Sequence, residues 1–141
     1  HGLTAYRARF DLAHELGHLV LHRHLHADDL DDKATLDLVE DQAHQFAGAF
    51  LLPEASYGAE AVRSDLEYLL ALKKRWGVSI AAQIKRQQAL ELLSKDQCAR
   101  LWQALARRRW RNPEPLDLET PTETPVLLRR AAEFLAEHKA L

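Results

Sequence analysis

The run HELGHLVL, residues 14–21, holds the most informative pattern in this 141-residue chain. Over residues 6–21, apolar residues recur at steps of three and four, which is the period of a helix rather than of a strand. His14 and His18 are four positions apart, so on a helix both imidazoles project from one face, about one turn apart. Two imidazoles at this spacing can hold one divalent ion, and the pattern therefore predicts a metal site on a helix.

Glu15 lies inside the same motif and has a different expected role. Because it follows His14 directly, its carboxylate points off the line of the two ligands, toward a water on the metal, and can take the proton of that water as general base. The ion would make this water acidic enough to attack at neutral pH and would polarise the carbonyl under attack. The H-E-x-x-H pattern thus predicts a zinc peptidase with Glu15 as its catalytic residue.

A third ligand must come from another part of the chain, because a catalytic zinc site takes three protein ligands and keeps one position open. Glu40 is the best candidate, 22 residues beyond His18, on a second helix that the apolar spacing predicts. A polar connecting loop, predicted over residues 22–37, is long enough to fold this helix antiparallel against the first. The second helix must end at or before Leu52, because Pro53 disfavours helical geometry in the residue ahead of it.

His44 lies four residues beyond Glu40 and shares its helix face. Two interpretations of His44 stay open at this point. It can hydrogen-bond one of the ligands from outside the coordination sphere, or it can compete with Glu40 for the metal.

The group that would stabilise an oxyanion is not identified by the sequence. The candidates are a segment upstream of His1, Tyr57, and the histidines of the connecting loop, which are His22, His24 and His26. Apart from that role, we interpret the loop histidines as exposed polar residues. Since the chain begins at His1 and contains no Met, we expect it to be a piece of a longer protein.

Two separated segments together resemble a known family. The first is RARFDLAHELGHLVLH, residues 7–22, and the second is EDQAHQFA, residues 40–47, followed by LLP, residues 51–53. In this order they resemble the ImmA/IrrE family of bacterial metallopeptidases. The resemblance covers about residues 4–57 directly and continues more loosely through WGVS, residues 76–79.

This resemblance implies a zincin fold in which His14, His18 and Glu40 hold Zn²⁺ and Glu15 is the catalytic base. It also implies a protein substrate, because members of the family cleave helix-turn-helix repressors and so switch on stress-response or mobile-element genes. The chain departs from the family at His44, where Asn or Asp is usual, and in the sheet that precedes the motif helix, which is not visible here. We therefore expect a mainly α fold, with a zincin-like helical core whose upstream sheet is missing or minimal, followed by a helical C-terminal region.

Four further helices are predicted from start and stop signals. They cover residues 64–77, 79–90, 94–109 and 124–135. Ser64 with Glu67 forms a predicted capping box for the first of these helices. Ser94 with Gln97 forms another for the third. A proline-rich stretch, residues 111–124, is interpreted as a linker, and no strand is predicted.

The charges are unevenly distributed along the chain. Residues 1–63 hold five Lys/Arg against eleven Asp/Glu, residues 64–112 hold eleven against four, and residues 113–141 hold three against six. With the helix pattern, this predicts three parts. They are a zincin-like metallopeptidase core (1–63), a basic helical region that is helix-turn-helix-like (64–112), and a linker with a terminal helix (113–141).

The basic middle part supports an alternative function. Two helices joined by WGVS have the outline of a helix-turn-helix, and their positive charge would suit DNA phosphates. However, Lys73 stands where a small residue should let the helices approach, and Gln83 stands where an apolar residue is expected. DNA binding by a regulator is therefore the less favoured hypothesis. A further alternative is a non-catalytic binding module, with a metal-free or degenerate site, that grips a regulator.

Composition adds expectations about the surroundings of the protein. No apolar run approaches the roughly 18 residues of a membrane helix, so we expect no membrane partner. Cys98 is the only cysteine and cannot form a disulfide within the chain. These features favour a cytoplasmic protein.

Overall fold

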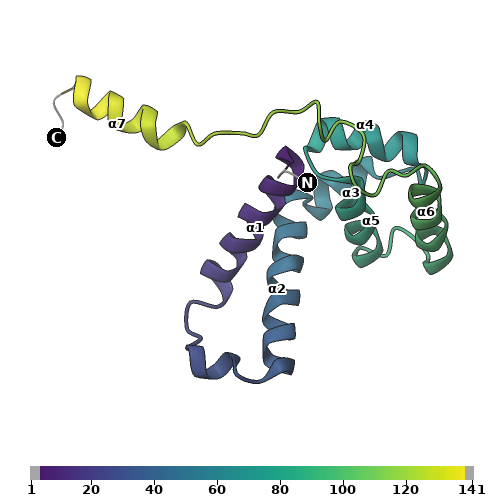
Figure 1. Cartoon of the computed structure of the whole chain (residues 1–141), viewed down its shortest axis with the longest axis horizontal. Coiled ribbons are helices and arrows are strands. Elements are labelled where there is room, and N and C mark those ends of the chain that lie inside the picture. The colour runs from purple at the N-terminus through teal and green to yellow at the C-terminus, as the bar shows by residue number, and fades with distance from the viewer. Residues whose placement is uncertain (1–3, 139–141) are drawn as a thin grey trace.

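The computed structural model describes residues 4–138, and within them it contains seven α-helices, one 3-10 turn and no strand (Figure 1). The helices are α1 (Ala5–Leu21), α2 (Lys33–Leu51), α3 (Glu54–Glu60), α4 (Leu66–Trp76), α5 (Ile80–Ala89), α6 (Lys95–Arg107) and α7 (Leu127–Glu137). The 3-10 turn covers Ala27–Leu30. The mainly α fold predicted from the sequence is confirmed. None of the described helices is both long and apolar enough to cross a membrane.

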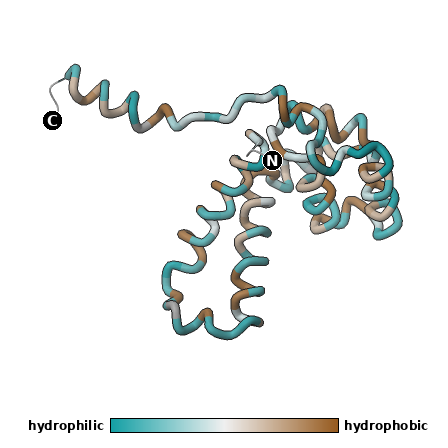
Figure 2. The backbone as a smooth tube through the Cα atoms, viewed as in Figure 1, coloured by the Kyte–Doolittle hydropathy of each residue, from teal (hydrophilic) through white to brown (hydrophobic). Residues whose placement is uncertain are grey.

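The helices form two groups with different shapes. In Figure 1, α1 and α2 make a long antiparallel hairpin that projects from a compact group formed by α3 to α6. An extended segment then leads to α7, which stands away from the other helices in the same view. Figure 2 shows apolar and polar residues alternating along α7, and its Leu127 and Phe134 are 81% and 59% exposed.

Small residues let α1 and α2 approach each other closely. Ala13 and Gly17 of α1 are buried, and so are Ala43 and Ala47 of α2. A Cβ at Gly17 would lie 3.1 Å from the Cδ1 of Phe46 and 3.3 Å from the Cα of Ala43, which is tighter than ordinary van der Waals contact. The hairpin therefore depends on small side chains along the line where its helices meet.

The loop of the hairpin is shorter than the predicted range of residues 22–37. The Asp32 carboxylate accepts a hydrogen bond from the Thr35 backbone N–H at 3.0 Å, so α2 begins at Lys33. This is ordinary N-cap chemistry for an aspartate, and it satisfies one of the free N–H groups of the first turn. The predicted end of this helix is confirmed, since α2 ends at Leu51.

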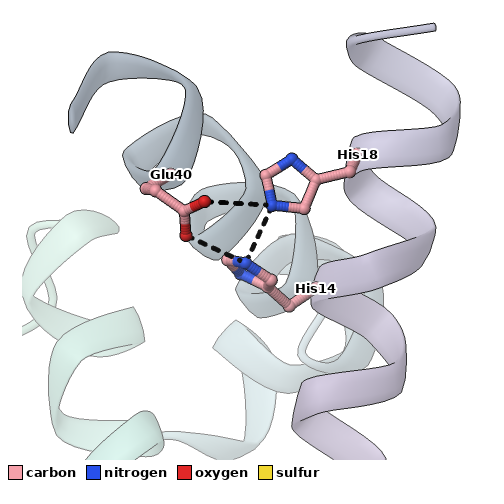
Figure 3. Close-up of side chains that lie close together, drawn as sticks. All are labelled: His14, His18 and Glu40. Carbon is pink, nitrogen blue, oxygen red and sulfur yellow. Dashed lines mark hydrogen bonds and ion pairs between the residues drawn. The ribbon is translucent and has the colours of Figure 1, made fainter. Parts of the chain in front are cut away.

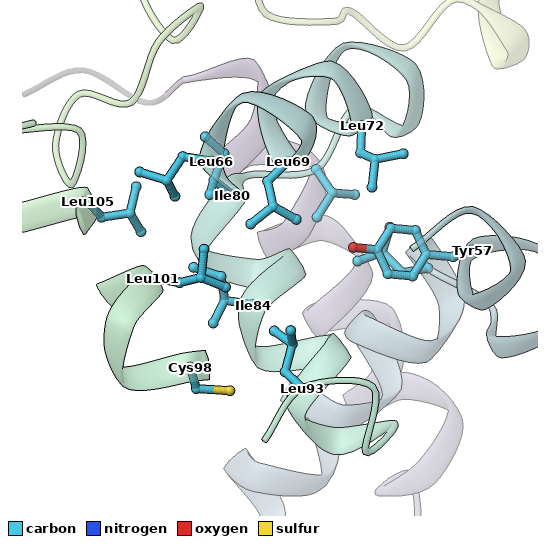
Figure 4. Close-up of a cluster of buried hydrophobic side chains, with 12 residues drawn as sticks. Tyr57, Leu66, Leu69, Leu72, Ile80, Ile84, Leu93, Cys98, Leu101 and Leu105 are labelled. Carbon is cyan, nitrogen blue, oxygen red and sulfur yellow. The ribbon is translucent and has the colours of Figure 1, made fainter. Parts of the chain in front are cut away.

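The buried core lies among α3, α4, α5 and α6 (Figure 4). Two members of this core, Leu52 and Tyr57, precede residue 63 in the sequence, and the other members follow it. These other members are Leu66, Leu69, Leu72, Val78, Ile80, Ile84, Leu93, Cys98, Leu101 and Leu105. The division of the chain at residue 63 stays a prediction.

Two helix starts in this group differ from the sequence expectation. Ser64 does not begin a capping box, because the neighbouring Asp65 caps α4 by accepting from the Tyr68 N–H at 2.9 Å. The short helix α3 was not predicted. The starts of α5 at Ser79 and of α6 at Ser94 agree with the sequence prediction, including the Ser94 capping box.

Gln83, at a position where an apolar residue was expected, is fully buried and hydrogen-bonded. Its Nε2 donates to the carbonyl oxygens of Leu69 at 3.1 Å and Val78 at 3.0 Å. Its Oε1 accepts from the Tyr57 hydroxyl at 3.2 Å. Because its polar atoms find partners, a buried amide is tolerated at the junction of α4 and α5.

Lys73, the other unexpected residue, is also fully buried and is neutralised by two carboxylates. Its ammonium donates to Glu114 at 2.9 Å and to Asp117 at 2.6 Å, and it lies 4.2 Å from the centre of the Tyr6 ring. Glu114 also accepts from the Ile80 N–H at 2.8 Å. The stretch after Pro113, predicted as a linker, is thus anchored against α4 and the start of α5.

We expect Glu114→Gln to lower the free energy of unfolding by about 3 kcal/mol, because it leaves the buried Lys73 ammonium with one carboxylate instead of two. Urea denaturation followed by circular dichroism measures this change. Asp37→Asn is the matched control, since the Lys33–Asp37 ion pair is 85% and 64% exposed and its loss should cost less than about 1 kcal/mol. A loss at Glu114 no larger than that at Asp37 contradicts the assigned role of the buried network.

Gly77 ends α4 with a φ of +66°, and a Cβ there would run into the Arg9 guanidinium. We expect Gly77→Ala to destabilise the fold by about 1–2 kcal/mol, the cost of a left-handed conformation for a residue with a Cβ. Gly48→Ala is the control, because Gly48 is helical and a Cβ there would lie 3.7 Å from its nearest neighbour. Alanine should stabilise that helix by up to about 1 kcal/mol. Unfolding curves of the two variants should therefore shift in opposite directions, and a shift in the same direction argues against this account of Gly77.

Candidate metal centre

His14, His18 and Glu40 converge between the two helices of the hairpin (Figure 3). The Nε2 atoms of His14 and His18 are 3.0 Å apart. The Glu40 carboxylate reaches across from α2, with one oxygen 3.3 Å from His14 Nε2 and the other 3.5 Å from His18 Nε2. The helix spacing of the motif and the antiparallel return of α2 together produce this arrangement.

The donor set suits a tetrahedral metal ion. An ion with bonds of about 2.0–2.1 Å holds its ligand atoms roughly 3.3–3.4 Å apart. Here the two Nε2 atoms are 3.0 Å apart, and each has a different Glu40 oxygen nearby, at 3.3 and 3.5 Å, so that one ligand atom from each residue lies within 4.8 Å of the others. Two imidazole nitrogens and one carboxylate are also the chemistry of a common type of catalytic zinc site. The side chain of Glu40 is 47% exposed and that of His14 is 13% exposed, so the cluster is open to solvent on the Glu40 side.

His44 lies beside this cluster rather than in it. Its Nδ1 donates to the backbone oxygen of Glu40 at 2.8 Å. The His44 ring meets the His14 ring edge-on, with ring centres 4.4 Å apart. The Nδ1 of His14 is buried and has no hydrogen-bond partner within residues 4–138, so His44 packs against His14 without satisfying that nitrogen.

Glu15 is on α1, directly after His14, and is exposed. In the part of the chain that the structure describes, it takes part in no side-chain hydrogen bond or ion pair. Its carboxylate is therefore free to accept a proton or a hydrogen bond from a bound molecule.

His22 and Gln42 are residues of the site that the sequence analysis missed. His22 Nδ1 lies 3.0 Å from His18 Nδ1, and His22 Nε2 lies 2.9 Å from Gln42 Oε1. The interpretation of His22 as an exposed loop residue is therefore wrong, because it is half-buried at the end of α1. The available signal was its spacing, since His14, His18 and His22 recur every four residues on one helix face.

Tyr57 does not lie at the candidate metal centre. It is fully buried in the core of α3 to α6, where its hydroxyl donates to Gln83 Oε1 and accepts from Gln87 Nε2 at 2.7 Å. This burial raises the pKa of Tyr57 to about 12. Tyr57 is thus a structural residue, and it is excluded as the oxyanion donor.

Comparison with known proteins identifies the family. The model of the family described as the IrrE N-terminal-like domain matches residues 1–87, which include the histidines of α1 and Glu40. No curated protein and no solved structure matches the chain. The family match covers more than half of the 141 residues and supports a metallopeptidase-type domain with a zincin-like helical core. The chain therefore belongs to the IrrE N-terminal-like domain family, the ImmA/IrrE metallopeptidases that its sequence motifs resemble.

Proposed function

We propose that this protein is a zinc-dependent endopeptidase of a bacterial regulatory system that cleaves a helix-turn-helix repressor. One observation carries the proposal: the Glu40 carboxylate faces the Nε2 atoms of both His14 and His18 across the helix hairpin. The family match supports peptidase chemistry. The repressor substrate comes from the family resemblance, and the proposed place of action in the cytoplasm comes from the single cysteine of the chain.

His14, His18 and Glu40 would hold the ion. When bound, zinc supplies a Lewis acid that polarises a carbonyl and makes water more acidic. Glu15 would accept the proton of the attacking water at a carboxylate oxygen and pass it to the nitrogen of the leaving amine. Its exposure and its lack of partners among residues 4–138 leave it available for both transfers.

Exposed apolar side chains beside the motif support a protein substrate. Leu12, Leu16 and Leu19 of α1 are 70%, 36% and 72% exposed. Apolar residues grouped on a surface commonly mark a site of interaction with another protein. Because positions 12, 16 and 19 share one face of α1 and positions 14 and 18 lie on another, these leucines offer a contact surface on the hairpin that is separate from the metal centre.

We expect the wild-type protein to hold one zinc ion. The variants His14→Ala and Glu40→Ala should bind it at least about 100-fold more weakly, because loss of a direct ligand costs more than loss of a neighbouring residue. Metal analysis after gel filtration and a chelator competition titration measure this. His24→Ala is the control, since its only side-chain hydrogen bond within residues 4–138 is with Arg23, and zinc binding should be unchanged. No zinc in the wild type would overturn the proposal and favour the non-catalytic binding module.

Glu15→Gln should retain zinc but lose cleavage of a repressor by about 100-fold or more, because the amide cannot take up a proton. The assay follows repressor cleavage by gel electrophoresis, with the zinc content of each sample measured in parallel. Glu54→Gln provides a matched loss of an exposed carboxylate, on α3, and should cleave at the wild-type rate. Full activity of Glu15→Gln would show that another group acts as the base.

A further inference from the structure

A line of polar contacts leads away from the metal centre through His18. Its Nε2 faces His14 and Glu40, while its Nδ1 lies 3.0 Å from the Nδ1 of His22. The Nε2 of His22 in turn lies 2.9 Å from the side-chain oxygen of Gln42 on α2. Both ring nitrogens of His18 are thus engaged, one toward the metal centre and one toward α2.

The chemistry of these atoms determines where the protons lie. An amide oxygen only accepts hydrogen bonds, so Gln42 requires a proton on the Nε2 of His22. A neutral imidazole carries one N–H, and His22 Nδ1 is then an acceptor. The partner at 3.0 Å, His18 Nδ1, must therefore be the donor. With its proton on Nδ1, neutral His18 has its free electron pair on Nε2, which accepts from the Nε2–H of His14 at 3.0 Å.

We propose that His22 and Gln42 are positioning residues that lock His18 in the Nδ1–H tautomer, so that its Nε2 is ready to bind metal. This inference rests on the proposed metal site and adds two residues to it. In a free histidine side chain the proton prefers Nε2, which would block that atom as a ligand. The relay from α2 reverses this preference before any metal arrives.

Backbone geometry supports the relay. His22 is the C-cap of α1, and its backbone N–H donates to the carbonyl oxygen of His18 at 2.9 Å. This bond holds the two residues one turn apart, with their rings centred at 5.1 Å. Gln42 lies two positions beyond Glu40 on α2, so the helix that supplies a ligand also orients a ligand of the other helix.

The two histidines of the motif differ in the hydrogen bonding of their Nδ1 atoms. His14 has no partner at its buried Nδ1 within residues 4–138, whereas His18 has one. Removal of His22 should therefore change the tautomer of His18, and the tautomer of His14 should change with it, because their Nε2 atoms are 3.0 Å apart and only one of them can donate.

The first test is nitrogen NMR of the imidazole rings in the metal-free wild-type protein, at about pH 8, which is above the ordinary pKa of a histidine side chain. A protonated and an unprotonated ring nitrogen have clearly different shifts, so the tautomer is read directly. We expect the proton of His18 on Nδ1 in the wild type and a shift toward Nε2 in His22→Ala. A wild-type proton on Nε2 would overturn the proposal.

The second test measures affinity for Zn²⁺ alone in variants with wild-type helix content by circular dichroism. His22→Ala should bind zinc about 10–100-fold more weakly, as is typical when the partner of a ligand is lost. His22→Asn should largely restore binding, because its Oδ1 takes the place of the Nδ1 acceptor. Gln42→Leu should also bind more weakly. Gln45→Leu is the control, since within residues 4–138 the Gln45 side chain bonds only to Asp41 on its own helix. Wild-type affinity in both His22→Ala and Gln42→Leu would overturn the relay.

The two tests separate this inference from the proposed function. If the wild type binds no zinc, the proposed function fails, and the NMR of the metal-free protein still decides where the His18 proton lies. If zinc binds tightly but His18 carries its proton on Nε2, the relay is wrong and the metal site stands.

Discussion

The separation of α1 and α2 determines the geometry of the whole metal centre, because two ligands lie on one helix and the third lies on the other. Gly17 sets that separation: a Cβ there would meet Phe46 and Ala43 at 3.1–3.3 Å. The distances from Glu40 to His14 and His18 change directly with the spacing of the helices. Small residues along the line of contact therefore serve both the packing of the hairpin and the chemistry of its site.

The hairpin is attached to the rest of the molecule at its base. Arg9 donates to the carbonyl oxygen of Gly77 at 3.0 Å and pairs with Glu123, and the Tyr6 hydroxyl bonds to Thr120 at 3.0 Å. The buried Lys73 lies beneath the Tyr6 ring. Residues of α1, of α4 with the start of α5, and of the segment after α6 thus meet at the base of the hairpin. The segment after α6 contacts both α1 and the α4–α5 pair and so links them.

The two unexpected polar residues of the core, Lys73 and Gln83, are tolerated because each finds specific partners. The Lys73 ammonium lies between two carboxylates, and Gln83 satisfies two backbone carbonyls and a tyrosine. Both residues break the usual pattern of a helix-turn-helix, yet neither opens a gap in the core. His14 Nδ1 is a contrasting case, a buried nitrogen without a partner in the described structure. It lies at the candidate site, where incomplete satisfaction is more common than elsewhere.

Local signals in the sequence were sufficient for six of the seven described helices, for the family and for the likeness of the motif to a metal site. Apolar spacing, serine caps, Gly77 and Pro53 act over a few residues, so they predict helices without knowledge of the fold. Three local features depended on competition between neighbouring residues. The N-cap of α4 was predicted at Ser64 but is Asp65, and the loop before α2 is shorter than predicted. The short helix α3 was not predicted at all. The convergence of Glu40 on the histidines, the burial of Tyr57, the anchoring of Lys73 by Glu114 and the relay through His22 and Gln42 were decided only by tertiary structure. Each of these joins residues from different elements of the fold, and their distances depend on packing that no local pattern encodes.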